Sequence, residues 1–130
     1  MRKPRTDFRR DEDGATAVEF VLWLPAFMLI LAFILDITLS MVAHSLMWDV
    51  ARDTVRQLSI GKFTASQAVG HAETAAALHG KTPVVSANDI GPQVWVNIEV
   101  PVADVTFFNM LGLAGSERLS ARAVMMQEPL

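Results

Sequence analysis

The chain has 130 residues, 52% of them hydrophobic, and contains no cysteine. This length allows one compact domain with additional segments, and the lack of cysteine excludes thiol-based redox chemistry and thiolate metal sites. The formal net charge is −3, but residues 14–130 alone carry six basic and ten acidic side chains. Such an acidic balance gives no support for nucleic-acid binding.

The chain opens with a charged leader. Met1–Asp13 holds five basic and four acidic residues, with Pro4 and few apolar side chains, so we interpret it as disordered and ended by Gly14. All five bases lie close to the apolar stretch that follows. Because Lys and Arg beside a membrane span remain on the cytoplasmic side, we expect a cytoplasmic N-terminus and an exported C-terminal part.

The next segment, Ala15–Leu35, is predicted to be a transmembrane helix. It contains one ionisable residue, Glu19, and twelve Leu, Ile, Phe or Val residues. Its 21 residues rise about 31 Å as a helix, enough to cross a hydrocarbon core of about 30 Å. Pro25 removes one backbone hydrogen bond, which membrane helices tolerate. The alternative is a buried core helix, but a domain this small can hardly cover such a helix on all sides.

The helical pattern continues through residues 36–61 with a different character. Asp36 is expected at the far membrane interface, because it follows Ala15 by 21 residues. Beyond it, apolar side chains recur at helical spacing and charged ones mark the opposite face, so we predict an amphipathic extension that Gly61 ends. The apolar face is Met47, Ala51, Val55 and Leu58, and the charged face is Asp49, Arg52, Asp53 and Arg56.

Residues 62–130 are predicted to form an exported α+β domain. The alanine-rich stretch Thr64–His79 indicates a second helix, capped by Thr64 or Ser66 and ended by Gly80. The alternation Val94, Val96, Ile98, Val100 is typical of a strand with one apolar face.

Three further features complete the predicted sheet. A strand begins at Val84 and turns at Ala87–Pro92, and a final strand covers Leu119–Met126. Pro101 is expected near a strand end. Between the last two strands, Asp104–Leu113 is expected to be a helical turn or loop with Phe107 and Phe108 packed inward. The antiparallel sheet would pack against the amphipathic part of the long helix.

Few residues in this domain are candidates for a metal, cofactor or catalytic site. His71, Glu73 and His79 match no single helical face, so we predict no metal site, no cofactor and no catalytic residues. Trp95 lies on the face of its strand opposite the apolar one and is a candidate interaction surface.

The segment around Gly14 has a mechanistic interpretation. If a peptidase cuts after Gly14, Ala15 carries a new positive amine and Glu19 lies one helical turn away. In a membrane, a carboxylate needs a cation or a proton, and this amine, on its own helix or a neighbouring one, supplies the charge. The simpler alternative is that Gly14 ends a loop and Glu19 is favoured by the helix dipole.

This site resembles that of type IV-like prepilins, most closely the TadE/TadF-like pseudopilins of the tight-adherence (Flp) pilus. The similarity rests on DEDG, then ATAVEF, then an apolar run with Pro25. Supporting positions are Asp36, the stretch Ala51–Gly61 and the late strand ending Ala123–Glu128.

The resemblance implies cleavage between Gly14 and Ala15 by an aspartic prepilin peptidase at the bacterial inner membrane. It implies that Glu19 acts in helix assembly, with Phe20 as the adjacent aromatic. It also implies partners among other pilins and the assembly platform, and no enzymatic activity. Major Flp pilins are much shorter, so the α+β tail favours a minor subunit. The acidic residues just before Gly14 depart from the family pattern.

Two other interpretations remain open from the sequence. The chain can be an uncut, signal-anchored envelope protein that binds a partner through its exported domain. It can also carry a Sec signal peptide cut near Ala43, which would release a soluble domain.

Overall fold

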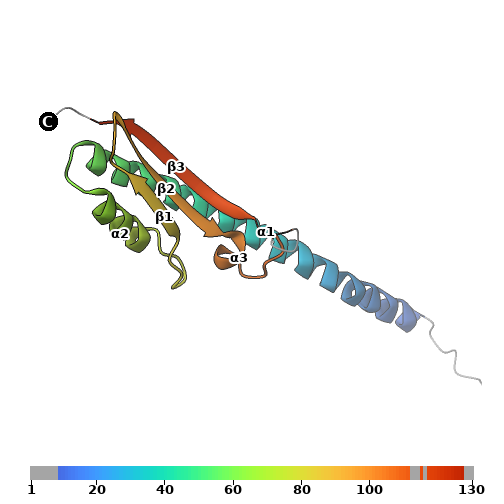
Figure 1. Ribbon diagram of the computed structural model, residues 1–130. Coiled ribbons are helices and arrows are strands. Elements are labelled where there is room, and N and C mark those ends of the chain that lie inside the picture. Colours follow the sequence, from blue (N-terminus) through green and yellow to red (C-terminus); the bar gives the residue numbers. More distant parts are fainter. Residues whose placement is uncertain (1–8, 112–114, 116, 128–130) are drawn as a thin grey trace, which may run out of the picture.

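The fold is a single long helix with a small α+β domain packed on its C-terminal half (Figure 1). The structure is a computed structural model and describes residues 9–111, 115 and 117–127. The predicted fold class is confirmed. The elements in chain order are α1 (Arg9–Ser59), α2 (Ala65–Ala75), β1 (Val84–Asn88), β2 (Gln93–Pro101), α3 (Val102–Val105) and β3 (Arg118–Met126).

Helix α1 is continuous over 51 residues and includes Pro25. It starts at Arg9, so the prediction of a disordered leader is wrong for residues 9–13, while residues 1–8 lie outside the described part of the chain. Gly61 ends the helix as predicted: its φ is 71°, and its N–H donates to the carbonyl of Leu58 at 3.1 Å.

The sheet is antiparallel in the order β1-β2-β3. The central strand places Ile98 opposite Val85 on one side and Ala121 on the other. Pro101 is the last residue of β2, as expected. The β1–β2 turn is shorter than predicted, because the strand continues to Asn88, whose side chain bonds both backbone groups of Ile90.

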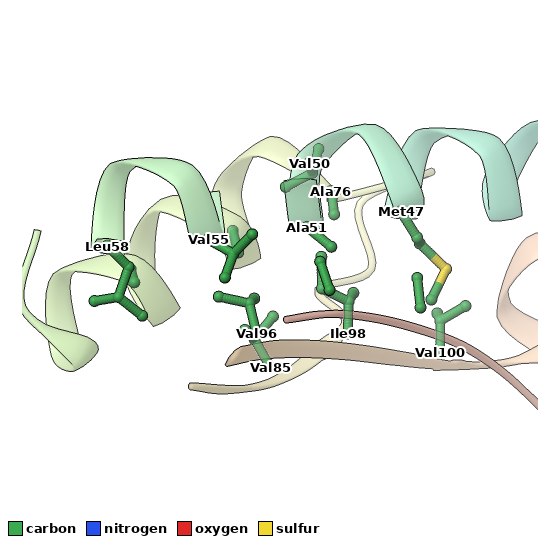
Figure 2. Close-up of a cluster of buried hydrophobic side chains, with 14 of the residues drawn as sticks. Met47, Val50, Ala51, Val55, Leu58, Ala76, Val85, Val96, Ile98 and Val100 are labelled. Atoms are coloured by element: carbon green, nitrogen blue, oxygen red, sulfur yellow. The ribbon is translucent and has the colours of Figure 1, made fainter. Parts of the chain in front are cut away.

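The predicted apolar face of the helix forms the core of the domain. Met47, Ala51, Val55 and Leu58 are at most 2% exposed. In Figure 2 their side chains point toward the inward-facing residues of the sheet. The small side chain of Ala51 allows the helix to approach the sheet closely, and the buried Ala68 and Ala72 allow the same for α2, which packs against α1 and β1 in this core. The inward-facing residues labelled on the strands are Val85, Val96, Ile98 and Val100.

Helix α2 begins at the predicted cap but ends early. The Thr64 side chain accepts from the N–H of Gln67, and the Gln67 side chain accepts from the N–H of Thr64, which forms a capping box. The helix ends at Ala75, so the prediction that Gly80 ends it is wrong. Gly80 instead has a φ of 74° in a tight turn where Leu78 and Lys81 bond each other.

Candidate functional site

The N-terminal half of α1 presents its side chains to the surroundings. The segment Gly14–Ser59 is long and apolar enough to cross a membrane, and only 11% of its most apolar 18-residue window is buried. A core helix of a soluble protein would be mostly buried. The helix is therefore consistent with a membrane anchor. Large apolar side chains more than half exposed along it include Val18, Phe20, Val21, Leu22, Trp23, Phe27, Met28, Leu29, Ile30 and Ile34.

The four residues of the predicted processing and assembly site lie on this exposed half. Gly14, Ala15, Glu19 and Phe20 are all exposed within one continuous helix. A Cβ atom added to Gly14 would meet no atom within 4 Å. Packing among the residues that the structure describes therefore does not require a glycine at this position.

Glu19 and Phe20 belong to a larger surface that we call the aromatic face. Thr16, Glu19, Phe20, Trp23 and Phe27 line a shallow, open hollow of about 480 Å³ on one side of the helix. The aromatic side chains are 63%, 59% and 57% exposed. This grouping was not predicted, although the spacing of residues 16, 20, 23 and 27 follows the helical period and indicates one shared face. The aromatic face therefore places one carboxylate beside three exposed aromatic rings, against which a second helix can pack.

Asp36 has a role that the sequence reasoning also missed. Its side chain is fully buried and accepts hydrogen bonds from three backbone N–H groups, those of Phe107 at 3.0 Å, Phe108 at 3.0 Å and Met110 at 2.7 Å. Burial raises the pKa of this carboxyl, but the three N–H donors outweigh it, so the net pKa is lowered. Asp36 therefore fixes the loop of residues 106–111 to the long helix.

The prediction that Phe107 and Phe108 pack inward is wrong. The two side chains are 76% and 56% exposed. The reason is the contact with Asp36: the backbone N–H groups turn toward the carboxylate, and the rings lie outside. The centre of the Phe107 ring lies 6.2 Å from the centre of the His79 ring, which it meets edge-on, and 6.5 Å from the centre of the Phe108 ring.

Trp95 lies where alternation predicted, on the face of the sheet away from α1. It is half-buried between Asn88 of β1 and Val124 of β3. The guanidinium of Arg122 lies 4.7 Å from the centre of its ring. This cation–π contact covers part of the indole, and the remaining exposed part is the candidate interaction surface.

The histidines serve local contacts. His71 Nδ1 lies 3.4 Å from the hydroxyl of the buried Thr54, and His79 lies beside Phe107. His44 accepts from the indole N–H of Trp48 at 3.0 Å. Within the part of the chain that the structure describes, no three His, Cys, Asp or Glu side chains are arranged to hold a metal ion.

Comparison with known proteins gives one match. The family model described as TadE-like protein matches residues 14–56, starting at the glycine singled out above and covering the exposed and the packed parts of α1. No curated protein and no solved structure matches the chain significantly. The resemblance drawn from the sequence is thus confirmed over this segment. The chain carries a TadE-like protein domain at residues 14–56.

Proposed function

We propose that this protein is a minor pseudopilin of the tight-adherence (Flp, or Tad) pilus, made as a prepilin and cut between Gly14 and Ala15. The observation that carries the proposal is where the family match begins, at Gly14, where a charged leader meets an apolar helix. An aspartic prepilin peptidase at the cytoplasmic face of the inner membrane would make the cut. The exposed position of Gly14, where an added Cβ atom would meet no described atom within 4 Å, suits a recognition role.

The proposed topology follows from charge. Residues 15–35 would cross the inner membrane once. Because five Lys or Arg side chains precede Gly14, residues 1–14 would remain in the cytoplasm as the leader. Residues 36–61 extend the helix into the exported domain, which residues 62–130 complete. Ala43 is 1% exposed in the middle of α1, so a signal-peptide cut there would sever the helix inside the core. The burial of Ala43 in the core therefore argues against the alternative in which a signal peptide is removed and a soluble domain is released.

The proposed assembly contact is an ion pair at the start of the mature helix. Cleavage gives Ala15 a positive amine one turn from Glu19, and a neighbouring subunit staggered along the same axis offers the same amine. In lipid, an ion pair is strongly preferred to a lone carboxylate. Phe20, Trp23 and Phe27 would then pack against the partner helix beside this ion pair. Other pilins or pseudopilins and the assembly platform are the proposed partners.

N-terminal sequencing of the full chain, co-expressed with a prepilin peptidase, tests the proposal. The expected mature chain begins Ala15-Thr16-Ala17, and a Gly14→Val variant should remain uncut. Because a Cβ atom at Gly14 would meet no described atom within 4 Å, loss of cleavage in that variant would reflect recognition and not misfolding. A chain that keeps Met1 in the presence of active peptidase would instead support the uncut, signal-anchored alternative, with Trp95 as its candidate partner surface.

A further inference from the structure

Two exposed rings lie at the end of the exported domain that faces the free half of α1. In Figure 1, α3 and the segment that follows it lie beside α1 where its packed half gives way to the free half. Phe107 and Phe108 are among the exposed large hydrophobic residues of this domain and lie in the loop of residues 106–111, here called the membrane-side loop. Their position along the helix is fixed, because Asp36 binds the N–H groups of both residues at 3.0 Å.

The position of this loop along the axis of α1 matches the outer boundary of the hydrocarbon core of a bilayer. Asp36 follows Ala15 by 21 residues, a rise of about 31 Å along a helix, against a hydrocarbon thickness of about 30 Å. When residues 15–35 cross the membrane, Asp36 and the backbone bound to it lie at the outer boundary of the hydrocarbon. This is the level at which aromatic side chains are favoured in membrane proteins.

The apolar surface of the span continues onto the two rings. Leu35, Thr38 and Leu39 of α1 line a hollow of about 370 Å³ together with Phe107 and Phe108. This hollow opens beside the last lipid-facing turn of the helix, so an acyl chain packed along Leu35 reaches both rings without crossing a polar surface.

Polar groups begin immediately beyond the rings. His79 lies against Phe107, and Lys81 pairs with Asp104 at 3.7 Å while its side chain remains 62% exposed. Apolar rings next to a histidine and an exposed lysine reproduce the order of the bilayer itself, from acyl chains to charged headgroups.

We propose that Phe107 and Phe108 insert into the outer headgroup–acyl boundary of the same bilayer that α1 crosses. The exported domain would then rest on the membrane through two contacts, the helix and the membrane-side loop, which fixes its orientation before assembly. This inference depends on the proposed membrane span but not on cleavage after Gly14 or on pilus formation.

Site-directed spin labelling of the full chain tests the proposal, because the natural sequence has no cysteine. Single variants Phe108→Cys, Ile90→Cys and Leu29→Cys would each carry one nitroxide in vesicles of phosphatidylethanolamine and phosphatidylglycerol. Ile90 is the matched control: it is an 81% exposed apolar residue in the turn at the far end of the domain. Leu29, 58% exposed in the middle of the span, reports whether the helix is in lipid. Relaxation by oxygen, which concentrates in lipid, is compared with relaxation by a water-soluble nickel chelate.

The expected oxygen-to-nickel accessibility ratio is highest at position 29, intermediate at 108 and several-fold lower at 90. An equal ratio at 108 and 90 would overturn the inference while leaving the membrane anchor intact. Protection of position 108 from both reagents would also overturn it, since a second protein copy and not lipid would then cover the ring. Nickel access at position 29 would refute the anchor itself and the inference with it. Phe107→Cys repeats the measurement should labelling at 108 disturb the fold.

Discussion

The carboxylate of Asp36 accepts a hydrogen bond from the backbone N–H of Phe108 at 3.0 Å, although 72 residues separate the two in the chain. The same oxygen accepts from Phe107, and the second oxygen accepts from Met110. One side chain on the long helix therefore holds the loop of residues 106–111 that follows α3. The stability of the domain and the position of its two exposed rings both depend on this residue.

Replacing Asp36 should destabilise the domain. Asp36→Ala removes the acceptor of three N–H groups, and each buried donor left without a partner costs about 1–3 kcal/mol. Because water reaches part of the exposed loop, we expect the free energy of unfolding to fall by about 2–5 kcal/mol. Urea unfolding of the detergent-solubilised chain, followed by tryptophan fluorescence, measures this. Asp49→Ala is the control, since Asp49 is an exposed carboxylate on the same helix and its loss should change stability by less than about 0.5 kcal/mol. Equal effects of the two changes would contradict the role assigned to Asp36.

The contribution of Asp36 should disappear in acid. Hydrogen bonds from three N–H groups lower the pKa of its carboxyl below the ordinary value of 3.8, despite the opposing effect of burial. The unfolded chain therefore binds this proton at a higher pH than the folded chain does. The stabilisation is complete above the ordinary pKa and is lost as the pH falls through the lowered one. The stability difference between the wild type and Asp36→Ala should remain constant from neutral pH to about pH 5 and shrink below pH 3.8. A difference that grows in acid would show that the carboxylate is not the stabilising form.

Truncating the centre of the sheet should cost more than truncating its outer face. Ile98 is fully buried between Val85 and Ala121, so Ile98→Ala is expected to lower the free energy of unfolding by about 2–5 kcal/mol through lost burial and a cavity. Val124→Ala on the opposite face, where the side chain is 51% exposed, is the matched control and should cost less than about 1 kcal/mol. The same urea titration compares them, and a larger effect at Val124 would reverse the assignment of the buried face.

Glu19 should be needed for assembly but not for folding or cleavage. Because its side chain is exposed on α1, Glu19→Ala should leave the unfolding transition and the mature N-terminus unchanged. Pili should nevertheless be reduced or absent, since the amine of Ala15 would lose its carboxylate partner in the membrane. Electron microscopy of cells carrying the variant as their only copy measures piliation. Asp53→Ala, an exposed carboxylate far from the aromatic face, serves as the control. Normal piliation with Glu19→Ala would rule out the proposed ion pair.

Local sequence patterns determined most of the fold. The length of the apolar run, the buried face Met47–Ala51–Val55–Leu58, the alternation along β2 and the cap at Thr64 were all predicted and are all present. Each of these depends on residues within a few positions of one another, where helical and strand periods and capping rules apply. The proposed processing site at Gly14 likewise rests on contiguous residues, and the family match begins at this glycine.

Only the tertiary structure decided what Asp36 and the two phenylalanines do. From the length of the apolar stretch, Asp36 was predicted to lie at a membrane interface. Phe107 and Phe108 were predicted to lie inside the core. The structure brings Asp36 to the backbone of residues 107–110 and leaves both rings outside. No periodicity encodes a hydrogen bond across more than 70 residues, because such a contact exists only after the sheet has packed on α1 and returned the chain to the helix. The orientation of the rings follows from that contact, since the buried backbone groups must be satisfied first.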